Sequence, residues 1–230
     1  MCQNIQLFIL PYSGARANQF SDICMKLEKK IKIDTIEYAG RGRRAREPFL
    51  LEYSLFIDDI KEYIVKHRDP SLPYALLGYS IGGLFAYDLL AKGCLKEDPK
   101  HLFICACEDA RQQLPVISDL PEDKFWDIII GLGGVDRRLI NNKIFLKLFS
   151  KTLRSDFHVA EQHSYSITDK SITCPVSVLY SEKDTPFLSI RGWQEVCEQR
   201  ITFIQFEGDH FFALEYPDLF AKVICEQLKV

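Results

Sequence analysis

The stretch LLGYSIGGLFAYD, residues 76–88, joins an apolar run to a helical pattern through a serine that is flanked by glycines. Ser80 stands between Gly78 and Gly82 in the pattern G-x-S-x-G. In this pattern a sharp turn holds the serine in a strained backbone conformation, and side chains at the two glycine positions would not fit. The turn also places the hydroxyl at the amino end of the following helix, where free N–H groups favour developing negative charge. The stretch predicts a nucleophilic serine, and the alternative interpretation is an ordinary serine in a glycine-rich loop.

Outward from Ser80, short apolar runs alternate with helical patterns along most of the chain. The runs are nearly continuous, as expected for strands that are buried on both faces. They cover residues 5–10, 31–37, 74–79, 101–107, 176–180 and 201–206. Apolar residues at helical spacing cover 54–66, 81–92 and 217–228. Strands that alternate with helices predict an α/β fold with a mainly parallel, doubly wound sheet.

Residues 113–166 depart from this alternation. Within them, 118–166 carry helical patterns with no strand between. The segment LPEDKFWDIIIG begins with a proline and an acidic first turn, which are both signals for the start of a helix. Insertions at the carboxyl edge of such sheets tend to form lids. We therefore expect one domain over residues 1–230, with a helical lid inserted at 113–166.

The composition excludes several classes of function. The 230 residues are 47% hydrophobic and 27% charged, and their net charge of −3 gives no basic footprint for nucleic acid or an anionic membrane. No apolar run is long enough for a membrane span, and the start lacks the basic region of a signal peptide. The eight cysteines are scattered without a CxxC pair, which predicts reduced thiols. Cys105 and Cys107 are expected to share one strand face. We expect a cytoplasmic monomer without metal.

A serine hydroxyl needs a base, and one of the five histidines is placed to provide it. In hydrolases with this motif, the serine is followed along the chain by an acid and then by the histidine. His210 follows the last predicted strand, on a loop at the carboxyl edge of the sheet. The others precede the serine, open a strand at the opposite edge or lie in the insertion; they are His67, His101, His158 and His163. We therefore predict His210 as the general base.

Two acids are candidates to orient that histidine. Asp184 in VSVLYSEKDTPF follows a predicted strand, and its loop leads directly to the last strand and His210. Asp109 also follows a predicted strand and stays an alternative. The acid would hold the imidazole tautomer and stabilise the imidazolium.

An oxyanion hole would need two backbone N–H donors. One is the N–H of Ile81, directly after the nucleophile. The other should come from the loop after the first predicted strand, LPYSGARANQF, in which Ser13 is the candidate.

Six segments, in their order and spacing, resemble one known family over essentially the whole chain. They are LPYSGARANQF, YAGRGRRAREP, GYSIGG, LRSDFHVAEQHSY, YSEKDTPF and GDHFF. The sequence is similar to the type II thioesterases of nonribosomal peptide and polyketide pathways. That family implies an α/β-hydrolase fold and hydrolysis of acyl groups from the phosphopantetheine arm of acyl or peptidyl carrier proteins, which clears stalled or misprimed synthases. It implies no dissociable cofactor, because the arm arrives with the substrate.

By motif position, Ser80, Asp184 and His210 match the family's triad. Ser13 and Ile81 match its oxyanion donors. The family usually has histidine directly before the nucleophile, whereas this chain has Tyr79, and the role of that residue stays open.

Other interpretations of the same residues stay open. The triad would equally serve a general carboxylesterase or lipase, and a catalytically silent protein with this fold could bind carriers. A basic cluster could meet the acidic surface of a carrier protein or the phosphate of its arm; it consists of Arg41, Arg43, Arg44 and Arg46. Alternatively, these arginines pair locally with Glu37 and Glu47.

Overall fold

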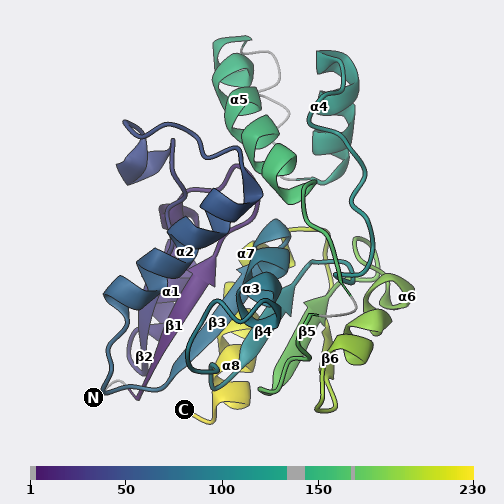
Figure 1. The fold of residues 1–230 in the computed structure, drawn as a ribbon. Helices are drawn as coiled ribbons and strands as arrows, with labels where there is room; N and C mark the ends of the chain where they lie inside the picture. Colours follow the sequence, from purple (N-terminus) through teal and green to yellow (C-terminus); the bar gives the residue numbers. More distant parts are fainter. Residues whose placement is uncertain (1–3, 134–142, 167–168) are drawn as a thin grey trace.

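The computed structural model describes residues 4–133, 143–166 and 169–230 (Figure 1). Within these residues, a six-stranded sheet has the order β2-β1-β3-β4-β5-β6, and all neighbouring strands are parallel. The strands are β1 (Ile5–Leu10), β2 (Ile31–Thr35), β3 (Tyr74–Tyr79), β4 (Leu102–Cys105), β5 (Val176–Tyr180) and β6 (Thr202–Gln205). The predicted parallel α/β fold is confirmed.

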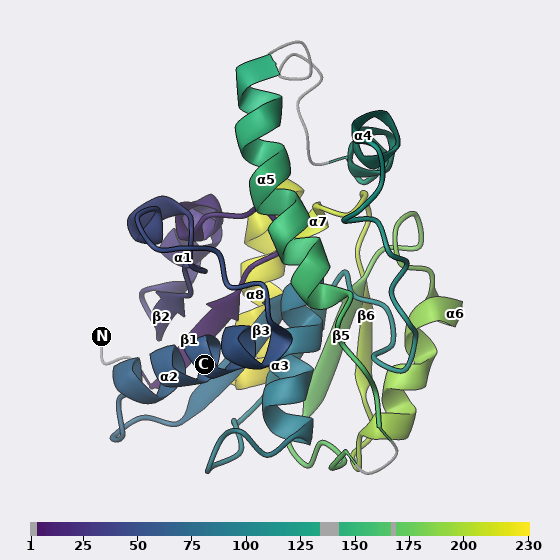
Figure 2. The same cartoon turned by 45° about the horizontal axis from the view of Figure 1, so that its top comes forward.

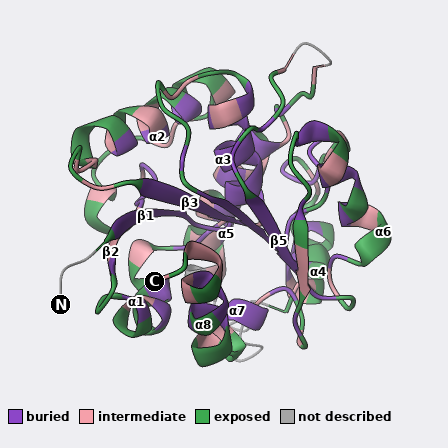
Figure 3. Ribbon diagram, turned by 90° about the horizontal axis from the view of Figure 1, so that it is seen from below, coloured by how far each residue is buried: buried purple, intermediate pink, exposed green. Residues whose placement is uncertain are grey.

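Helices cover both faces of this sheet (Figure 3). They are α1 (Ser21–Leu27), α2 (Tyr53–His67), α3 (Ile81–Ala91), α4 (Glu122–Gly131), α5 (Lys143–Ala160), α6 (Phe187–Ile190), α7 (Phe212–Glu215) and α8 (Pro217–Leu228), with 3-10 turns at Ala17–Phe20, Gly42–Arg44 and Arg191–Val196. Because successive strand residues point to opposite faces, Phe8 and Leu10 pack with α2 and α3, whereas Leu7 and Ile9 pack with α1, α7 and α8. No helix in the described ranges is long and apolar enough to cross a bilayer.

Three strands are shorter than the sequence patterns predicted, namely β2, β4 and β6. β4 ends at Cys105 because Ala106 has a positive φ of 48°, which turns the chain out of the sheet. As a result, Cys105 and Cys107 lie in the cores on opposite faces of the sheet. The prediction that they share one face is therefore wrong, although both are buried free thiols.

The strand order reverses between β1 and β3, and this reversal positions the candidate site. The chain passes from β1 to β2 on one side and then returns to β3 on the other side of β1. In an open parallel sheet, such a reversal leaves a crevice outside the carboxyl ends of the two strands. Leu10 pairs with Gly78, so the loop after β1 and the turn at Ser80 leave the sheet together at this crevice.

Two glycines allow the tight turn that follows β3. A Cβ atom at Gly78 would lie 2.2 Å from the carbonyl oxygen of Gly82, and one at Gly82 would lie 2.2 Å from the carbonyl oxygen of Leu10. Both contacts involve backbone atoms, which cannot swing aside as the end of a side chain can. The absence of side chains at these positions therefore brings the start of α3 against the loop after β1.

The segment 113–166 contains α4 and α5, which stand out from the layered body (Figures 1 and 2). Phe125, Trp126 and Ile129 of α4 form a small core with Leu153 of α5. Residues 134–142 of this segment lie outside the described residues. The function of a lid stays a prediction.

A buried ion pair joins this segment to α3. His163, which follows α5, donates from Nδ1 to Asp88 at 2.9 Å and from Nε2 to the carbonyl of Ala110 at 2.8 Å. Because both ring nitrogens face acceptors, the protonated imidazolium is the form that satisfies both contacts. The hydroxyl of Tyr53 donates to the same carboxylate, and Lys92 Nζ lies 3.1 Å from it. The end of the segment is thereby fixed to α3.

The two partners of this pair hold each other in their charged forms. Burial acts to lower the pKa of His163, but the hydrogen bond and charge of Asp88 outweigh it and raise this pKa above its ordinary 6.5. Burial acts to raise the pKa of Asp88, but His163 lowers it below its ordinary 3.8. The pair therefore stabilises the fold fully between the two ordinary pKa values, 3.8 for Asp88 and 6.5 for His163. Its contribution is lost as pH rises through the raised pKa of His163 or falls through the lowered pKa of Asp88.

The substitution His163→Gln should lower the free energy of unfolding by an amount that depends on pH. The difference from wild type should be largest between about pH 4 and pH 6, and it should shrink as the pH rises further, because wild type then loses its imidazolium. Urea unfolding at a series of pH values measures this difference. His158→Gln, at an exposed position of α5, is the control. A His163→Gln difference that does not change with pH would contradict the charged pair.

The substitution Gly82→Ala should destabilise the fold although alanine is the better helix former. The gain in helix propensity is about 1 kcal/mol, whereas overpacking against backbone costs about 1–3 kcal/mol or more. We expect a net loss in the free energy of unfolding, measured with urea. Gly131→Ala is the matched control, because nothing lies within 4 Å of a Cβ there. If both variants were as stable as wild type, the close approach of α3 to the loop after β1 would be wrong.

Candidate active site

Ser80 directly follows β3 and caps the amino end of α3. Its backbone is strained, with φ 54° and ψ −124°. Two hydrogen bonds hold this conformation, one from the Ser80 N–H to the carbonyl of Cys105 and one from the Gly83 N–H to the carbonyl of Ser80, each 2.8 Å long. The serine thus has the conformation that the G-x-S-x-G pattern predicts.

His210 and Asp184 meet at the same edge of the sheet. Asp184 follows β5 and His210 follows β6, and His210 Nδ1 lies 2.9 Å from each carboxylate oxygen of Asp184. Both side chains are 9% exposed. The hydroxyl of Ser181 donates to the carbonyl of Gly208 at 2.5 Å and links the two loops. The carboxylate places a proton on Nδ1 and leaves Nε2 able to accept one.

Asp109, the alternative acid, has a different partner. Arg111 donates to it from Nε at 3.0 Å and from Nη2 at 2.6 Å. The structure therefore brings Asp184, and not Asp109, into contact with His210.

A cavity of about 340 Å³ brings the predicted residues together. Ser80, Ile81, Asp184 and His210 all line it. Much of the remaining wall is apolar and comes from 113–166, including Leu114, Ile117, Ile128, Leu132 and Phe157. The described residues show no hydrogen bond between Ser80 and His210, and contacts of this kind often tighten only when substrate binds. The site combines a strained serine, an oriented histidine and a space that suits an apolar chain.

Ser13 lies beside this cavity. It lines an adjoining space of about 50 Å³ together with Tyr12, Phe149 and Leu153. His210, Leu132 and Phe157 line both spaces, so the space beside Ser13 adjoins the larger cavity.

The two predicted oxyanion donors share one property. Within the part of the chain that the structure describes, neither the Ser13 N–H nor the Ile81 N–H has a protein acceptor. By contrast, the N–H groups that follow Ser13 are used, since Gly14 donates to a carboxylate and Ala15 donates to the carbonyl of Tyr12. Both candidate donors are therefore available to a substrate oxygen.

Tyr79, whose role the sequence left open, holds the backbone of His210 through a hydrogen bond. Its buried hydroxyl donates to the carbonyl of His210 at 2.7 Å and lies 3.5 Å from the N–H of Ala213. Its ring contacts the imidazole edge to face, with 6.1 Å between the ring centres. Burial raises the pKa of Tyr79 well above its ordinary value, so the hydroxyl keeps its proton and stays a donor. Sequence reasoning missed this contact because 131 residues separate the partners.

The basic cluster is mostly engaged within the protein. Arg41 pairs with Asp156 of α5, and both side chains are buried. Arg44 pairs with Glu47, as the local alternative predicted, and also with Asp59 of α2 at 2.7 Å. Arg43 is exposed, but its Nε lies 3.9 Å from Glu37, as the local alternative also predicted, and its Nη2 donates to the carbonyl of Thr35. Arg46 is exposed as well. Asp156 was not identified from the sequence, although it lies in the quoted segment LRSDF.

Other reactive groups in the described part of the chain do not compete with Ser80. Cys107 lines the large cavity, but burial raises the pKa of its thiol far above the ordinary value, so the nucleophilic thiolate is not formed. His101, at the opposite edge of the sheet, is buried against the hydroxyl of Ser177, and burial lowers its pKa to about 4. Within the described residues, no group of three or more His, Cys, Asp or Glu could hold a metal ion.

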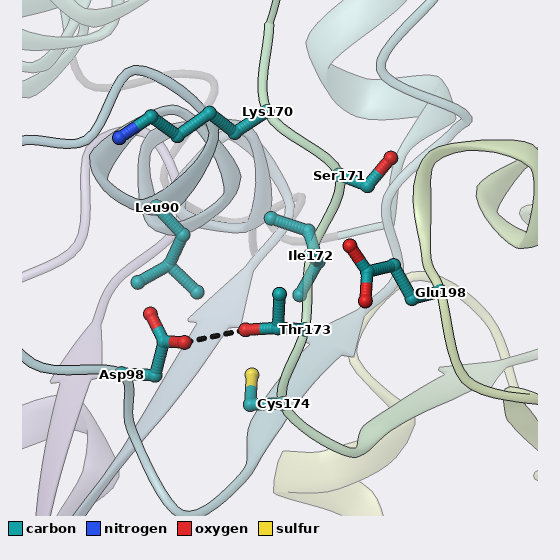
Figure 4. A pocket seen from close by; sticks show the side chains of 8 residues that line it. All are labelled: Leu90, Asp98, Lys170, Ser171, Ile172, Thr173, Cys174 and Glu198. Carbon is teal, nitrogen blue, oxygen red and sulfur yellow. Dashed lines mark hydrogen bonds between the residues drawn. The ribbon is translucent and has the colours of Figure 1, made fainter.

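A further cavity of about 450 Å³ lies at the other edge of the sheet, before β4 and β5 (Figure 4). Asp98 accepts a hydrogen bond from Thr173 there, and Lys170 and Glu198 stand at its rim (Figure 4). Among the described residues that line it, there is no histidine. The arrangement suited to nucleophilic chemistry is at the carboxyl edge.

The substitution Tyr79→Phe should slow the reaction of Ser80 with a fluorophosphonate probe. It keeps the ring but leaves the His210 carbonyl without its donor, which costs about 1–3 kcal/mol and loosens the loop of the base. Tyr74→Phe is the matched control, because the Tyr74 hydroxyl also donates to a backbone carbonyl, that of Glu97, far from the site. We expect urea unfolding to detect a loss of stability in both variants, and slower labelling in Tyr79→Phe only. Equal labelling rates would contradict the role of Tyr79.

The chain is similar to known proteins over nearly its whole length. A family model described as a thioesterase domain matches residues 5–228. The gramicidin S biosynthesis protein GrsT of Aneurinibacillus migulanus is 25% identical over an alignment of 236 positions, which covers 98% of this chain and 90% of that protein. Thioesterase PikA5 of Streptomyces venezuelae is 24% identical over 217 residues, which cover 90% and 75% of the two chains.

The chain is also similar to solved structures of thioesterases. ClbQ from the colibactin NRPS/PKS pathway superposes with a TM-score of 0.89 at 26% identity and covers 99% of this chain and 98% of its own. The α/β-hydrolase fold and the resemblance to type II thioesterases are confirmed. Because the family model spans nearly all of the sequence, the chain belongs to the thioesterase family.

Proposed function

We propose that this protein hydrolyses acyl thioesters on the phosphopantetheine arm of carrier proteins, with Ser80, Asp184 and His210 as its catalytic triad. The observation that carries the proposal is the Asp184–His210 contact in the cavity that Ser80 lines. The relatives support the substrate class, since one is named for gramicidin S biosynthesis and a similar structure comes from an NRPS/PKS pathway. The partner would be an acyl or peptidyl carrier protein.

The geometry suits a two-step acyl transfer. Ser80 Oγ attacks the thioester carbonyl carbon while its proton passes to His210 Nε2, and Asp184 stabilises the imidazolium. The carbonyl oxygen becomes an oxyanion that the Ile81 and Ser13 N–H groups bind. The C–S bond then breaks, and the leaving thiolate takes the proton from His210.

The second step regenerates the enzyme. Water gives a proton to His210 as its oxygen attacks the acyl-serine carbonyl carbon, and the C–O bond to Ser80 then breaks. The serine oxygen recovers the proton, and the free acid leaves. All the protons move through one histidine, so these steps require no metal or dissociable cofactor. The apolar wall from 113–166 would hold the acyl chain, as a lid over the site does.

The substitution Ser80→Ala should lower the hydrolysis of acyl-loaded carrier proteins by on the order of 10⁴-fold or more, because the step that forms the acyl-enzyme is lost. Mass spectrometry of carriers loaded with a panel of acyl groups, before and after incubation, measures it. Circular dichroism should show an unchanged fold. Ser71→Ala, in an exposed turn, is the matched control and should hydrolyse as wild type does.

Three outcomes would overturn parts of this proposal. Hydrolysis by Ser80→Ala would exclude the nucleophile. A strong preference of the wild type for oxygen esters over matched thioesters would instead identify a carboxylesterase. Failure of Ser80 to react with a fluorophosphonate probe, together with intact carrier binding, would identify a catalytically silent carrier-binding protein.

A further inference from the structure

One carboxylate from α5 reaches the loop that carries Ser13. The side chain of Asp156 is 1% exposed and accepts a hydrogen bond from the Gly14 N–H at 2.7 Å. Both of its oxygens also accept from the guanidinium of Arg41, whose side chain is 3% exposed. A bidentate pair of this kind has a planar, directional geometry, so the carboxylate has little freedom to rotate. Asp156 is therefore a fixed anchor for the backbone at Gly14.

The loop is held on both sides of Ser13. Before it, the buried hydroxyl of Tyr38 donates to the carbonyl of Pro11 at 2.9 Å. After it, Gly14 has a φ of 78°, and a Cβ there would lie 2.7 Å from Leu153 of α5. A residue with a side chain would be strained at this φ and would push the loop away from α5. The peptide that carries the Ser13 N–H lies between these two fixed points, and its carbonyl, that of Tyr12, accepts from the Ala15 N–H at 3.1 Å.

The charge on Arg41 decides whether this anchor helps or opposes the reaction. An isolated buried carboxylate so close to the oxyanion donors would raise the energy of an oxyanion through its like charge. Paired with a guanidinium, it contributes little net charge and keeps its hydrogen-bonding geometry. Arg41 also stacks over the ring of Tyr38 at 5.3 Å, so the same cation contacts both anchors of the loop.

We propose that Asp156 and Arg41 are positioning residues of the oxyanion hole. Asp156 holds the Gly14 N–H so that the Ser13 N–H faces the oxyanion, and Arg41 orients and neutralises Asp156. This inference rests on the proposed function, because an oxyanion forms only if Ser80 attacks a carbonyl. It gives a role to the segment LRSDF and to the one buried member of the basic cluster.

The test separates stabilisation of the oxyanion from substrate binding. The substrate is the hexanoyl thioester of pantetheine, and the probe is the matching trifluoromethyl ketone. Ser80 Oγ adds to the ketone carbon, its proton passes to His210, and the carbonyl oxygen becomes an oxyanion that the same N–H donors bind. The affinity for the ketone therefore reports on the oxyanion hole, independently of the steps that release thiol and acid.

The substitution Asp156→Ala should lower kcat by about 100-fold, with KM close to wild type, because it misplaces one oxyanion donor. The affinity for the ketone should fall in proportion to the loss in kcat. Asp156→Asn keeps an oxygen that can face the Gly14 N–H, so this variant should retain most of the kcat and most of the affinity for the ketone. This rescue distinguishes the hydrogen bond to Gly14 from a purely structural effect of the ion pair, which both variants lose.

A control and a second variant keep the test decisive. Asp59→Asn breaks the bidentate pair with Arg44, which belongs to the same arginine-rich loop, and should leave kcat and ketone affinity unchanged. If Asp156→Ala does not fold, as circular dichroism would show, the double variant Arg41→Met/Asp156→Leu removes both buried charges. It also lacks the acceptor for Gly14, and the same losses are expected.

Two results would overturn the inference. One is wild-type ketone affinity in folded Asp156→Ala or in the double variant. The other is an equal loss in Asp156→Asn and Asp156→Ala. A wild-type protein that neither hydrolyses the thioester nor forms the ketone adduct at Ser80 would instead overturn the proposed function, so the two failures are distinguishable.

Discussion

The approach of Gly82 to the backbone of Leu10 is the constraint on which the site depends. It brings the first turn of α3 to within van der Waals contact of the loop after β1. Because these segments end neighbouring strands at the point where the sheet order reverses, the two loops that would form an oxyanion hole meet beside Ser80. Steric fit and sheet topology thus determine where the site lies, independently of any charged residue.

Polar contacts from distant parts of the chain then fix each component. Tyr79 holds the backbone of His210, Asp156 holds that of Gly14, and His163 ties the end of the 113–166 segment to α3. The donors and acceptors are all buried, where an unpaired polar group is costly and a paired one is rigid. Two of the three contacts use an ion pair in which each charge is balanced by its neighbour.

Local patterns in the sequence predicted the sheet, the turn at Ser80 and the placement of Asp184 and His210 after their strands. Such features depend on the period of apolar residues and on glycine spacing, which can be observed in a short window. The partners of Tyr79 and Asp156 could not be predicted in this way, since 131 and 142 residues separate them from the backbone groups that they hold. The turn at Ala106 was also missed, because alanine gives no signal for a positive φ.

The division of the basic cluster into buried and exposed members has a consequence for ionic strength. Salt screens charges in solvent over a distance of about 8–10 Å, but it hardly affects a pair from which water is excluded. Arg41 and Asp156 belong to the second kind, whereas the side chain of Arg43 is 70% exposed. Added salt would therefore weaken an encounter with an acidic partner surface while leaving the geometry at Ser80 intact. The charges that could attract a partner at the surface are therefore different from the buried charges that fix the geometry of the site.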